Sequence, residues 1–392
     1  MENMENAVLV INAGSSSIKF AIFSVGKETK KIYHGMVDHI ATTPELIIYD
    51  IDKNIVLSEK FALTNYEGVV GNLIASINKF LKNFTLIAVG HRVVHGGTQY
   101  LNPVLINDTV IEDLTKLIPL APLHQPYNLN IIVAIRKIHP DLHQVACFDT
   151  AFHATQSKIV RTFAVPRKLS EEGVVKYGFH GLSYEYISTI LPKYFSSKIV
   201  DGKILVAHLG NGASACAINN KKSVASSMGF TALEGLMMGT RCGNIDPGVV
   251  LYLLDEKKLS VKETTNFLYK ESGLLGVSGV SSDVRELELS SDPNAKEALD
   301  LFCYRAAREL LALCTILKGL DILIFTAGIG EHSVLVRKKI CEWLSWLGIS
   351  IDDNANKTNA NIISDKNSKI TVAVIPTNEE LMIVQHTIKI IT

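Results

Sequence analysis

Residues 8–24 read VLVINAGSSSIKFAIFS, and we expect the rest of the chain to be organised around this stretch. The apolar runs on either side of residues 12–17 predict two β-strands, and the first of them reads as buried on both faces. The residues between the runs are small and polar, so the backbone can come close to a ligand, and three hydroxyl groups with backbone N–H groups can surround an anion. Lys19 can add a positive charge. A hairpin with an ordinary polar turn is the alternative, because Gly-Ser turns are common.

A second copy of this pattern lies at residues 204–220, which read ILVAHLGNGASACAINN. Aligned without a gap, the copy lies 196 residues further on, so that Gly14 matches Gly210 and Asn12 matches His208. This offset is half of the 392 residues. We interpret the two stretches as the openings of two related halves, which predicts a duplicated α/β domain with a phosphate cleft between the copies.

Charge and composition narrow the class of protein. Lysine plus arginine number 39 and aspartate plus glutamate also number 39, so the net charge is zero, which argues against nucleic acid or an anionic membrane as the main partner. The length and a hydrophobic content of 47% predict a soluble globular enzyme of two domains. No apolar run is long enough for a transmembrane helix, and the start lacks the basic residues of a signal peptide. Six scattered cysteines favour reduced thiols in a cytoplasmic protein.

Two strands of the first half run into residues that can carry chemistry. Residues 86–89 predict a buried strand that leads into GHRVVHGG, with Arg92 at its end, where open α/β sheets place ligand groups. A surface loop with solvated side chains is the alternative. Asp149 follows the strand predicted at residues 145–148 and suits a metal or substrate site, although an aspartate there is more commonly a helix N-cap.

The second half contains several glycine-rich segments. His180 lies between glycines at the start of a helix predicted through residue 190, although a lone histidine is more often structural. Residues 227–248 contain five glycines and Arg241, which predicts a long functional loop. Residues 273–285 predict another Gly/Ser segment. The strand predicted at residues 321–325 turns through TAGIGEH into a helix through residue 346, a pattern that can hold a nucleotide but is weak alone. Apolar spacing predicts the remaining elements, which are helices at 66–81, 128–138, 249–254 and 295–317, a strand at 370–375 and a closing helix.

With these loops in view, the sequence closely resembles the acetate kinases and the wider acetokinase family of short-chain acyl kinases. The stretches that carry the resemblance span the chain in order: VINAGSSSIKF at 10, GHRVVHGG at 90, LAPLH at 120, FDTAFH at 148, YGFHGLS at 177, HLGNGAS at 208, SMGF and ALEGLMMGTR from 227, SGVSSDVR at 278, TAGIGEH at 326 and PTNEEL at 376. The resemblance implies duplicated ribonuclease-H-like domains of the actin, sugar-kinase and heat-shock-ATPase superfamily, with mixed sheets flanked by helices around an interdomain ATP cleft. It also implies a homodimer. We expect domains at residues 1–150 and 151–380, with a final helix at about 380–392 that packs back on the first.

The resemblance also implies roles for individual residues. The catalytic set would be Asp149, His180 and Arg241, and the substrate contacts would be Arg92, Val94, Leu123, Phe179 and Ala232. The ATP or ADP contacts would be Lys19, His208, Leu209, Gly210, Asn211, Gly212, Asp283, Val284, Arg285, Gly328, Ile329, Gly330, Glu331 and His332. Asn12 and Glu379 would bind Mg²⁺ or Mn²⁺. The chain departs from the family pattern at Gln125, Tyr127, Ala225, Ala232, Cys242 and Asn244.

The implied reaction is ATP plus acetate giving ADP plus acetyl phosphate. A carboxylic acid with a pKa near that of a Glu side chain, about 4.3, is already ionised at pH 7, so the nucleophile needs no general base. The enzyme must instead bring two anions together and stabilise charge on the transferred phosphoryl group, which suits two arginines and a metal ion. Propionate is the alternative substrate. A nucleotide-switched ATPase like actin or a chaperone would share the phosphate loops, and a sugar kinase would need a base and polar sugar contacts.

Overall fold

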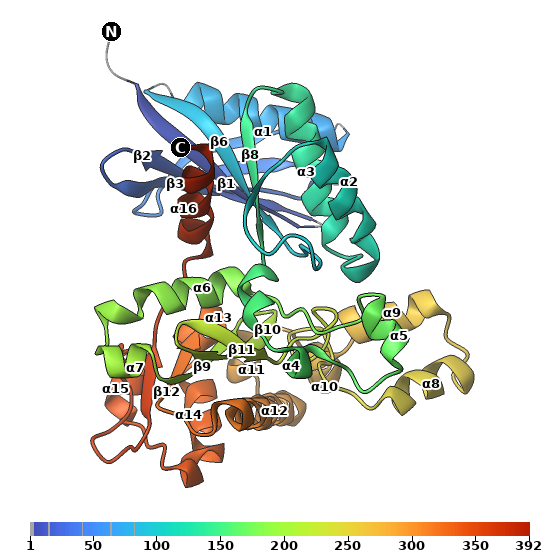
Figure 1. Cartoon of the computed structure of the whole chain (residues 1–392), viewed down its shortest axis with the longest axis vertical. Coiled ribbons are helices and arrows are strands. Elements are labelled where there is room, and N and C mark those ends of the chain that lie inside the picture. The colour runs from blue at the N-terminus through green and yellow to red at the C-terminus, as the bar shows by residue number, and fades with distance from the viewer. Residues whose placement is uncertain (1–3, 15, 41, 63–64, 82) are drawn as a thin grey trace. The chain divides into compact units, whose positions relative to one another are not determined.

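The architecture comes from a computed structural model, which describes residues 4–14, 16–40, 42–62, 65–81 and 83–392. Ser15, one of the three turn hydroxyls, lies outside the described residues. The chain forms two compact units, which are Met1–Ala151 with Asn378–Thr392, and Phe152–Thr377 (Figure 1). No helix in the described ranges is long and apolar enough to cross a membrane.

The first unit contains an eight-stranded mixed sheet in the order β5-β4-β3-β2-β1-β6-β8-β7. Its strands are β1 (Glu5–Ala13), β2 (Ile18–Val25), β3 (Thr29–Asp38), β4 (Glu45–Tyr49), β5 (Ile55–Lys60), β6 (Phe84–Val93), β7 (Val104–Leu105) and β8 (His143–Phe148). The strands from β1 to β5 pair antiparallel, whereas β6 runs parallel to β1 and β8 parallel to β6. The central strand β1 is buried on both faces, because Ala7 to Ile11 are all at most 1% exposed. Burial on both faces, as predicted, therefore explains the continuous apolar run of β1.

Helices cover both faces of this sheet. They are α1 (Tyr66–Phe80), α2 (Asp108–Lys116) and α3 (Gln125–Ile138), with the 3-10 turn η1 (Ile118–Leu120), and α16 (Glu379–Ile391). Apolar residues of α1 and α3 share one core with Leu9 and Val89. The last helix, α16, packs on the opposite face, because a Cβ on Gly90 would lie 2.4 Å from Thr387 Oγ1 and 2.6 Å from Ile383 Cγ2. The glycine at position 90 is what lets the C-terminal helix come this close.

The second unit has a five-stranded mixed sheet in the order β11-β10-β9-β12-β13. Its strands are β9 (Lys203–Leu209), β10 (Ala213–Asn219), β11 (Lys222–Ser226), β12 (Ile322–Thr326) and β13 (Thr371–Val374). Its helices are α4 (Lys158–Arg161), α5 (Arg167–Glu171), α6 (Gly181–Ile190), α7 (Ser197–Val200), α8 (Pro247–Asp255), α9 (Val261–Lys270), α10 (Gly273–Ser278), α11 (Val284–Leu289), α12 (Pro293–Leu317), α13 (Ala327–His332), α14 (Val334–Trp343) and α15 (Asp353–Lys357). Three 3-10 turns complete the chain at η2 (Ala151–Thr155), η3 (Leu191–Lys193) and η4 (Ser345–Leu347). The long helix α12 contacts β9, β10 and β11, and α6 packs on the apolar side chains of β9 and β10.

The two sheets share one topology, which confirms the predicted duplication. In each, three antiparallel strands (β3-β2-β1 or β11-β10-β9) are continued by two parallel strands (β6-β8 or β12-β13). The ungapped alignment is wrong beyond the turn, however. Asn12 pairs with Lys19, whereas its equivalent His208 pairs with Ser214, so the first turn is one residue longer than the second. A one-residue gap therefore brings β2 and β10 into register.

Three local expectations need correction. Gly273–Ser278 forms helix α10 and not an irregular segment, and the chain enters this helix through Gly273, whose positive φ of 65° glycine adopts without steric cost. The helix expected after residue 326 is broken at Ser333, whose extended backbone lets its hydroxyl accept the Val336 N–H and cap α14. The helix predicted from residue 128 begins earlier, at Gln125, because Pro126 is compatible with a first helical turn.

Candidate active site

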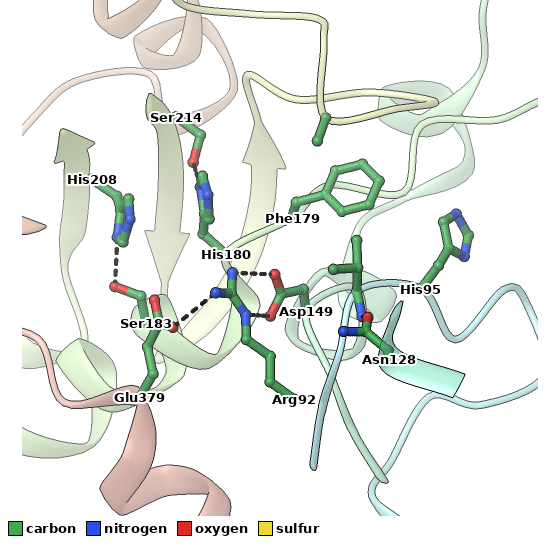
Figure 2. A network of polar contacts seen from close by, with 12 residues as sticks. Arg92, His95, Asn128, Asp149, Phe179, His180, Ser183, His208, Ser214 and Glu379 are labelled. Carbon is green, nitrogen blue, oxygen red and sulfur yellow. Dashed lines mark hydrogen bonds and ion pairs between the residues drawn. The ribbon is translucent and has the colours of Figure 1, made fainter. Parts of the chain in front are cut away.

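In the first unit, three charged residues meet where β6 and β8 end. The parallel register pairs Arg92 with Cys147, and the Asp149 N–H donates to the Val93 carbonyl, so both strands end at the same edge. Arg92 Nε donates to Asp149 Oδ1 at 2.9 Å and Nη2 donates to Oδ2 at 2.7 Å. Glu379, the first residue of α16, places Oε2 3.6 Å from Arg92 Nη1 (Figure 2). Sequence reasoning expected all three residues in the site, and the fold brings them together from positions far apart in the chain.

Burial sets the charge behaviour of this cluster. The side chains of Arg92, Asp149 and Glu379 are 19%, 2% and 18% exposed. Burial raises the pKa of Glu379 above its ordinary value, against the lowering effect of Arg92. Burial alone would lower the pKa of Arg92, but the two carboxylates raise it. The two carboxylates therefore favour the charged guanidinium, whereas burial disfavours the charged form of Glu379, which a further cation would favour.

Asn12 and Lys19 lie on the neighbouring strands. Asn12 follows the last residue of β1 that pairs with β6, and it pairs directly with Lys19 of β2. Residues that pair directly across antiparallel strands project from the same face, so Asn12 and Lys19 share a face of the sheet. Lys19 is exposed and Asn12 is half-buried. No group of three His, Cys, Asp or Glu side chains suited to a metal occurs among the described residues.

Two side chains of α3 hold the segment that follows β6. Asn128 accepts from the Val94 N–H at 3.1 Å and donates to the Ala13 carbonyl at 3.0 Å. Gln125 accepts from the His95 N–H at 3.2 Å and donates to the carbonyl of the same residue at 3.0 Å. The backbone of Val94 is thus fixed from the helix. Sequence reasoning noted Gln125 only as a departure and missed this clamp, because no local pattern links residue 125 to residue 95.

In the second unit, His180 and Arg241 converge on the turn between β9 and β10. A Cβ built on Gly212 would lie 3.4 Å from His180 Nε2 and 3.6 Å from Arg241 Nη2. The glycine loop that carries Arg241 docks on the same turn, since the Gly239 N–H donates to the Asn211 carbonyl at 3.1 Å. Arg241 Nη1 donates to the Ala232 carbonyl at 2.8 Å. Two cationic or N–H donor groups therefore face the expected phosphate turn.

The backbone of His180 is strained. Its φ of 57° and ψ of 25° are left-handed, which for a non-glycine residue costs on the order of 1–3 kcal/mol. The surrounding segment holds it there: His153 Nε2 donates to the Phe179 carbonyl at 2.9 Å, and the Tyr177 N–H donates to the Gly229 carbonyl at 2.9 Å. Gly178 is required, because a Cβ there would lie 2.6 Å from the His153 ring. His153 is a positioning residue that sequence reasoning quoted in a motif but gave no role.

Two histidines of the second unit stack beside this turn. The rings of His180 and His208 lie 4.3 Å apart with an interplanar angle of 18°. His180 Nδ1 contacts Ser214 Oγ at 2.7 Å, and His208 Nδ1 contacts Ser183 Oγ at 2.8 Å (Figure 2). Ser183 also contacts Thr377 Oγ1 at 2.8 Å. Both imidazoles are thus oriented by hydroxyl groups.

A pocket of about 490 Å³ adjoins the same turn within the second unit. It is lined by eight of the expected nucleotide contacts, Gly210, Asn211, Asp283, Val284, Arg285, Gly328, Ile329 and His332, together with Ser282, Glu288 and Ser333, which were not expected. Five expected contacts do not line it, namely His208, Leu209, Gly212, Gly330 and Glu331. Lys19 belongs to the first unit.

Several of these residues have other tasks. Leu209 is fully buried in β9. One Glu331 oxygen accepts from the Ala327 N–H at 2.8 Å and from the Thr377 N–H at 3.1 Å, so this carboxylate holds the turn into α13. Asp283 caps α11 and pairs with Arg285, and that hydrogen bond lowers the pKa of Asp283.

A buried arginine binds the backbone of α13, which carries three residues that line this pocket. Arg337 is fully buried, and its five N–H groups donate to five acceptors at 2.6 to 2.9 Å. Two of the acceptors are the carbonyls of Gly330 and Glu331 in α13, and the others belong to Asn356 and Asn359. Burial lowers the pKa of the guanidinium, although Glu288 favours its charge. Arg337 therefore ties α13 to α15 and to Asn359, a role that no sequence pattern indicated.

Two departures beside Arg241 have local explanations. Asn244 accepts from the Gly235 N–H and donates to Glu309 Oε1, both at 2.9 Å. An aspartate at this position would oppose Glu309, whereas asparagine satisfies it. Burial raises the pKa of the Cys242 thiol, which favours the neutral form. Ala225 is buried in β11 opposite Ala217.

Comparison with known proteins identifies one family and several similar sequences. A sequence model described as the Acetokinase family matches residues 7–385. The acetate kinase of Rhodopseudomonas palustris strain TIE-1 is 48% identical over 389 residues, which cover 98% of each chain. The acetate kinase of Rickettsia felis is 46% identical over 391 residues, which cover 98% of this chain and all of the relative.

Solved structures of related proteins match at the level of the whole chain. The acetate kinase of Porphyromonas gingivalis aligns with a TM-score of 0.88 at 37% identity, over 99% of this chain and 100% of that protein. A propionate kinase from Francisella tularensis aligns with a TM-score of 0.90 at 39% identity, over 97% of this chain and 98% of that protein.

Proposed function

This chain belongs to the acetokinase family, and from that premise we propose that it is an acetate kinase, which reversibly transfers the γ-phosphoryl group of ATP to acetate. The observation that carries the proposal is the convergence of His180 Nε2 and Arg241 Nη2 on Gly212, beside the lined pocket of the same unit. A donor and a cation at a glycine turn are what a transferring phosphoryl group requires.

The nucleotide occupies the pocket between the turn and α13 in this proposal. Gly328 has open space where a Cβ would be, so its backbone can approach a ligand closely. Gly210 and Asn211 line the same pocket and carry the phosphate turn. The exposed Arg285 side chain, held by Asp283, flanks the opening.

The acceptor carboxylate is already ionised at neutral pH, so no residue has to remove a proton. Arg241 Nη1 donates to the Ala232 carbonyl, and in this proposal Nη2, which lies near Gly212 of the phosphate turn, stabilises charge on the transferred group. In this proposal His180 donates a hydrogen bond from Nε2 to the same group. Both oxygens of Asp149 accept from Arg92, which makes Asp149 a positioning residue for Arg92 and not a base.

A divalent cation fits the oxygen atoms of the first unit. Glu379 is a partly buried carboxylate whose pKa is raised by burial, which supports a neighbouring cation, and Asn12 offers a carbonyl oxygen at the same end of the sheet. Mg²⁺ takes few protein oxygens and keeps several waters, which suits two such ligands. When bound, the cation would neutralise charge on the ATP phosphates.

The acyl chain is proposed to contact Val94, Leu123, Phe179 and Ala232, which match the family's substrate positions. Val94 and Phe179 are buried, and their backbones are held by Asn128 and His153. Propionate is the second candidate substrate, because Ala232 stands where the family usually has a bulkier proline. The likeness to a propionate kinase agrees with this alternative.

We also propose a cytoplasmic homodimer. All six cysteines are free thiols, and four of them are buried, which suits a reducing compartment. Large apolar side chains are exposed on α8 in the second unit, where Leu251 is 66% and Tyr252 50% exposed, and a subunit contact would cover them.

One assay separates the candidate functions. The purified chain with ATP and magnesium is offered acetate, propionate, glucose or no acceptor, and both ADP and acyl phosphate are measured. Acetyl phosphate with ADP formed in equal amount supports the proposal. Glucose-dependent ADP release, or ADP release that is equally fast without an acceptor, would show that the chain is a sugar kinase or a switch ATPase.

A further inference from the structure

Three side chains of the second unit form a hydrogen-bonded line that ends at His180. Tyr184 Oη contacts Ser214 Oγ, and Ser214 Oγ contacts His180 Nδ1 at 2.7 Å. Tyr184 and Ser214 are both fully buried, on α6 and β10. A buried hydroxyl between a phenol and an imidazole has one proton to give, so the direction of the line decides which nitrogen of His180 carries its proton.

The chemistry of the three groups favours one direction. A phenol is a stronger hydrogen-bond donor and a weaker acceptor than an aliphatic hydroxyl, and an unprotonated imidazole nitrogen is a better acceptor than a phenol oxygen. Tyr184 therefore donates to Ser214, and Ser214 donates to Nδ1. We propose that Ser214 and Tyr184 are positioning residues that hold His180 in the neutral tautomer with its proton on Nε2.

The surroundings of His180 support the neutral form. Its ring stacks on His208 at 4.3 Å, and Arg241 Nη2 shares the space above Gly212 with Nε2. A second positive charge on the imidazole would face the Arg241 guanidinium at close range. His208 is itself held at Nδ1 by Ser183, so both stacked rings receive a hydroxyl on the same nitrogen.

The consequence is that the Nε2–H group of His180 is already oriented as a hydrogen-bond donor before substrate binds. Nε2 lies beside Gly212 of the phosphate turn, and the contact between Nδ1 and Ser214 Oγ orients the ring. A donor that needs no reorientation or proton rearrangement during the reaction stabilises developing charge most effectively. This consequence for catalysis rests on the proposed function, whereas the tautomer itself can be observed without any substrate.

Nitrogen NMR of the ¹⁵N-histidine-labelled full-length protein tests the tautomer directly. The His180 signals are assigned by their loss in His180→Asn, and the expected result is a pyridine-type Nδ1 with a pyrrole-type Nε2 at neutral pH. A protonated Nδ1, or a doubly protonated ring, would overturn the proposal.

Variants of the line then test the positioning roles. Ser214→Ala should mix the two tautomers and lower kcat by about tenfold or more, with KM for ATP and acetate within about twofold of wild type, because only the transition-state interaction is lost. Tyr184→Phe should give a smaller fall, since Ser214 keeps its own proton for Nδ1. Ser214→Thr keeps the hydroxyl and should restore the wild-type spectrum.

Matched controls lie on neighbouring positions. Tyr186→Phe removes a hydroxyl from the same helix, and Ser188→Ala removes a serine hydroxyl that donates to the Lys221 carbonyl. Both should leave the His180 signals and kcat unchanged. If Ser214→Ala keeps the single tautomer and the wild-type kcat, Ser214 does not position His180. If His180 has the expected tautomer but the protein forms no acyl phosphate, the hydrogen-bonded line is confirmed and the proposed function is wrong.

Discussion

The Arg92 guanidinium donates two hydrogen bonds to the Asp149 carboxylate, from Nε to Oδ1 at 2.9 Å and from Nη2 to Oδ2 at 2.7 Å. These residues are 57 positions apart and meet because β6 and β8 are parallel neighbours. The pair leaves Nη1 of Arg92 directed at Glu379. Asp149 therefore sets the direction in which Arg92 can act, and the loss of Arg92 removes both of these hydrogen bonds from the buried Asp149 carboxylate.

The two arginines should be required for turnover. Arg92→Ala and Arg241→Ala are each expected to lose at least ~2.7 kcal/mol of transition-state stabilisation, about a hundredfold in kcat/KM, because each removes one electrostatic donor. Arg92→Lys should also lower kcat/KM, because an ammonium group cannot donate to both Asp149 oxygens in the way that a guanidinium does. Arg136→Ala, which breaks an exposed pair with Asp108, is the control. A folded variant of either arginine with wild-type turnover would exclude that residue from the mechanism.

Magnesium dependence should report on Asn12 and Glu379. Asn12→Ala and Glu379→Ala are expected to raise the magnesium concentration for half-maximal activity more than they raise KM for acetate, since carbonyl and carboxylate oxygens are magnesium ligands. Glu380→Ala is the matched control, because that neighbour pairs with Lys31 Nζ at 2.8 Å. An unchanged magnesium midpoint in both variants would contradict the assignment.

Stability against pH should reveal the cost of burying Glu379. Burial raises its folded pKa above the ordinary value of 4.5, so its favourable contribution is full below pH 4.5 and is lost as the pH rises through the folded pKa. Glu379→Gln carries no charge and avoids this loss. Without magnesium, its Tm should exceed that of wild type at pH 8, and the difference should shrink toward pH 5. A Glu379→Gln variant that is less stable than wild type at pH 8 would show that Arg92 outweighs burial.

Arg337 should matter for nucleotide binding although it is not among the residues that line the 490 Å³ pocket. Arg337→Met leaves the carbonyls of Gly330 and Glu331 buried without their donor, which should cost at least about 2 kcal/mol of stability. ADP affinity, measured by calorimetry at a temperature where the variant is folded, should fall because α13 is no longer tied to α15. Lys338→Met, which breaks an exposed pair with Asp353, is the control. Unchanged ADP affinity would limit Arg337 to a purely structural role.

Position 232 should influence the length of the acyl chain. Alanine lacks the ring carbons of proline, so the wall of the proposed acyl site recedes, and propionate should be used within about tenfold of acetate in kcat/KM, a gap of ~1.4 kcal/mol. Ala232→Pro keeps the carbonyl that Arg241 contacts and should shift the preference toward acetate. Acetate, propionate and butyrate are compared in both proteins. A hundredfold preference for acetate in wild type, or an unchanged ratio in the variant, would remove residue 232 as the determinant.

The sequence by itself carried the repeated strand–turn–strand pattern, most of the strands and helices, and the chemistry of the loops. Apolar runs and glycine turns are local signals, because burial on both faces and close backbone approach each demand particular residue types within a short window. The same signals placed Arg92 and Asp149 at the ends of strands and His180 and Arg241 in glycine-rich segments, and the family resemblance implied their roles.

What the folded chain added are partnerships between distant positions. The sheet register brings Arg92 next to Asp149. It also shows that the alignment of the two halves needs a one-residue gap in the turn. The helix after residue 378 returns to the first sheet because Gly90 makes room for it. The hydroxyl line to His180 and the Arg337 clamp also join residues far apart in the chain. Hydrogen-bond partners and the pKa of a buried group depend on packing in three dimensions, and no short stretch of sequence records which distant side chains will be packed together.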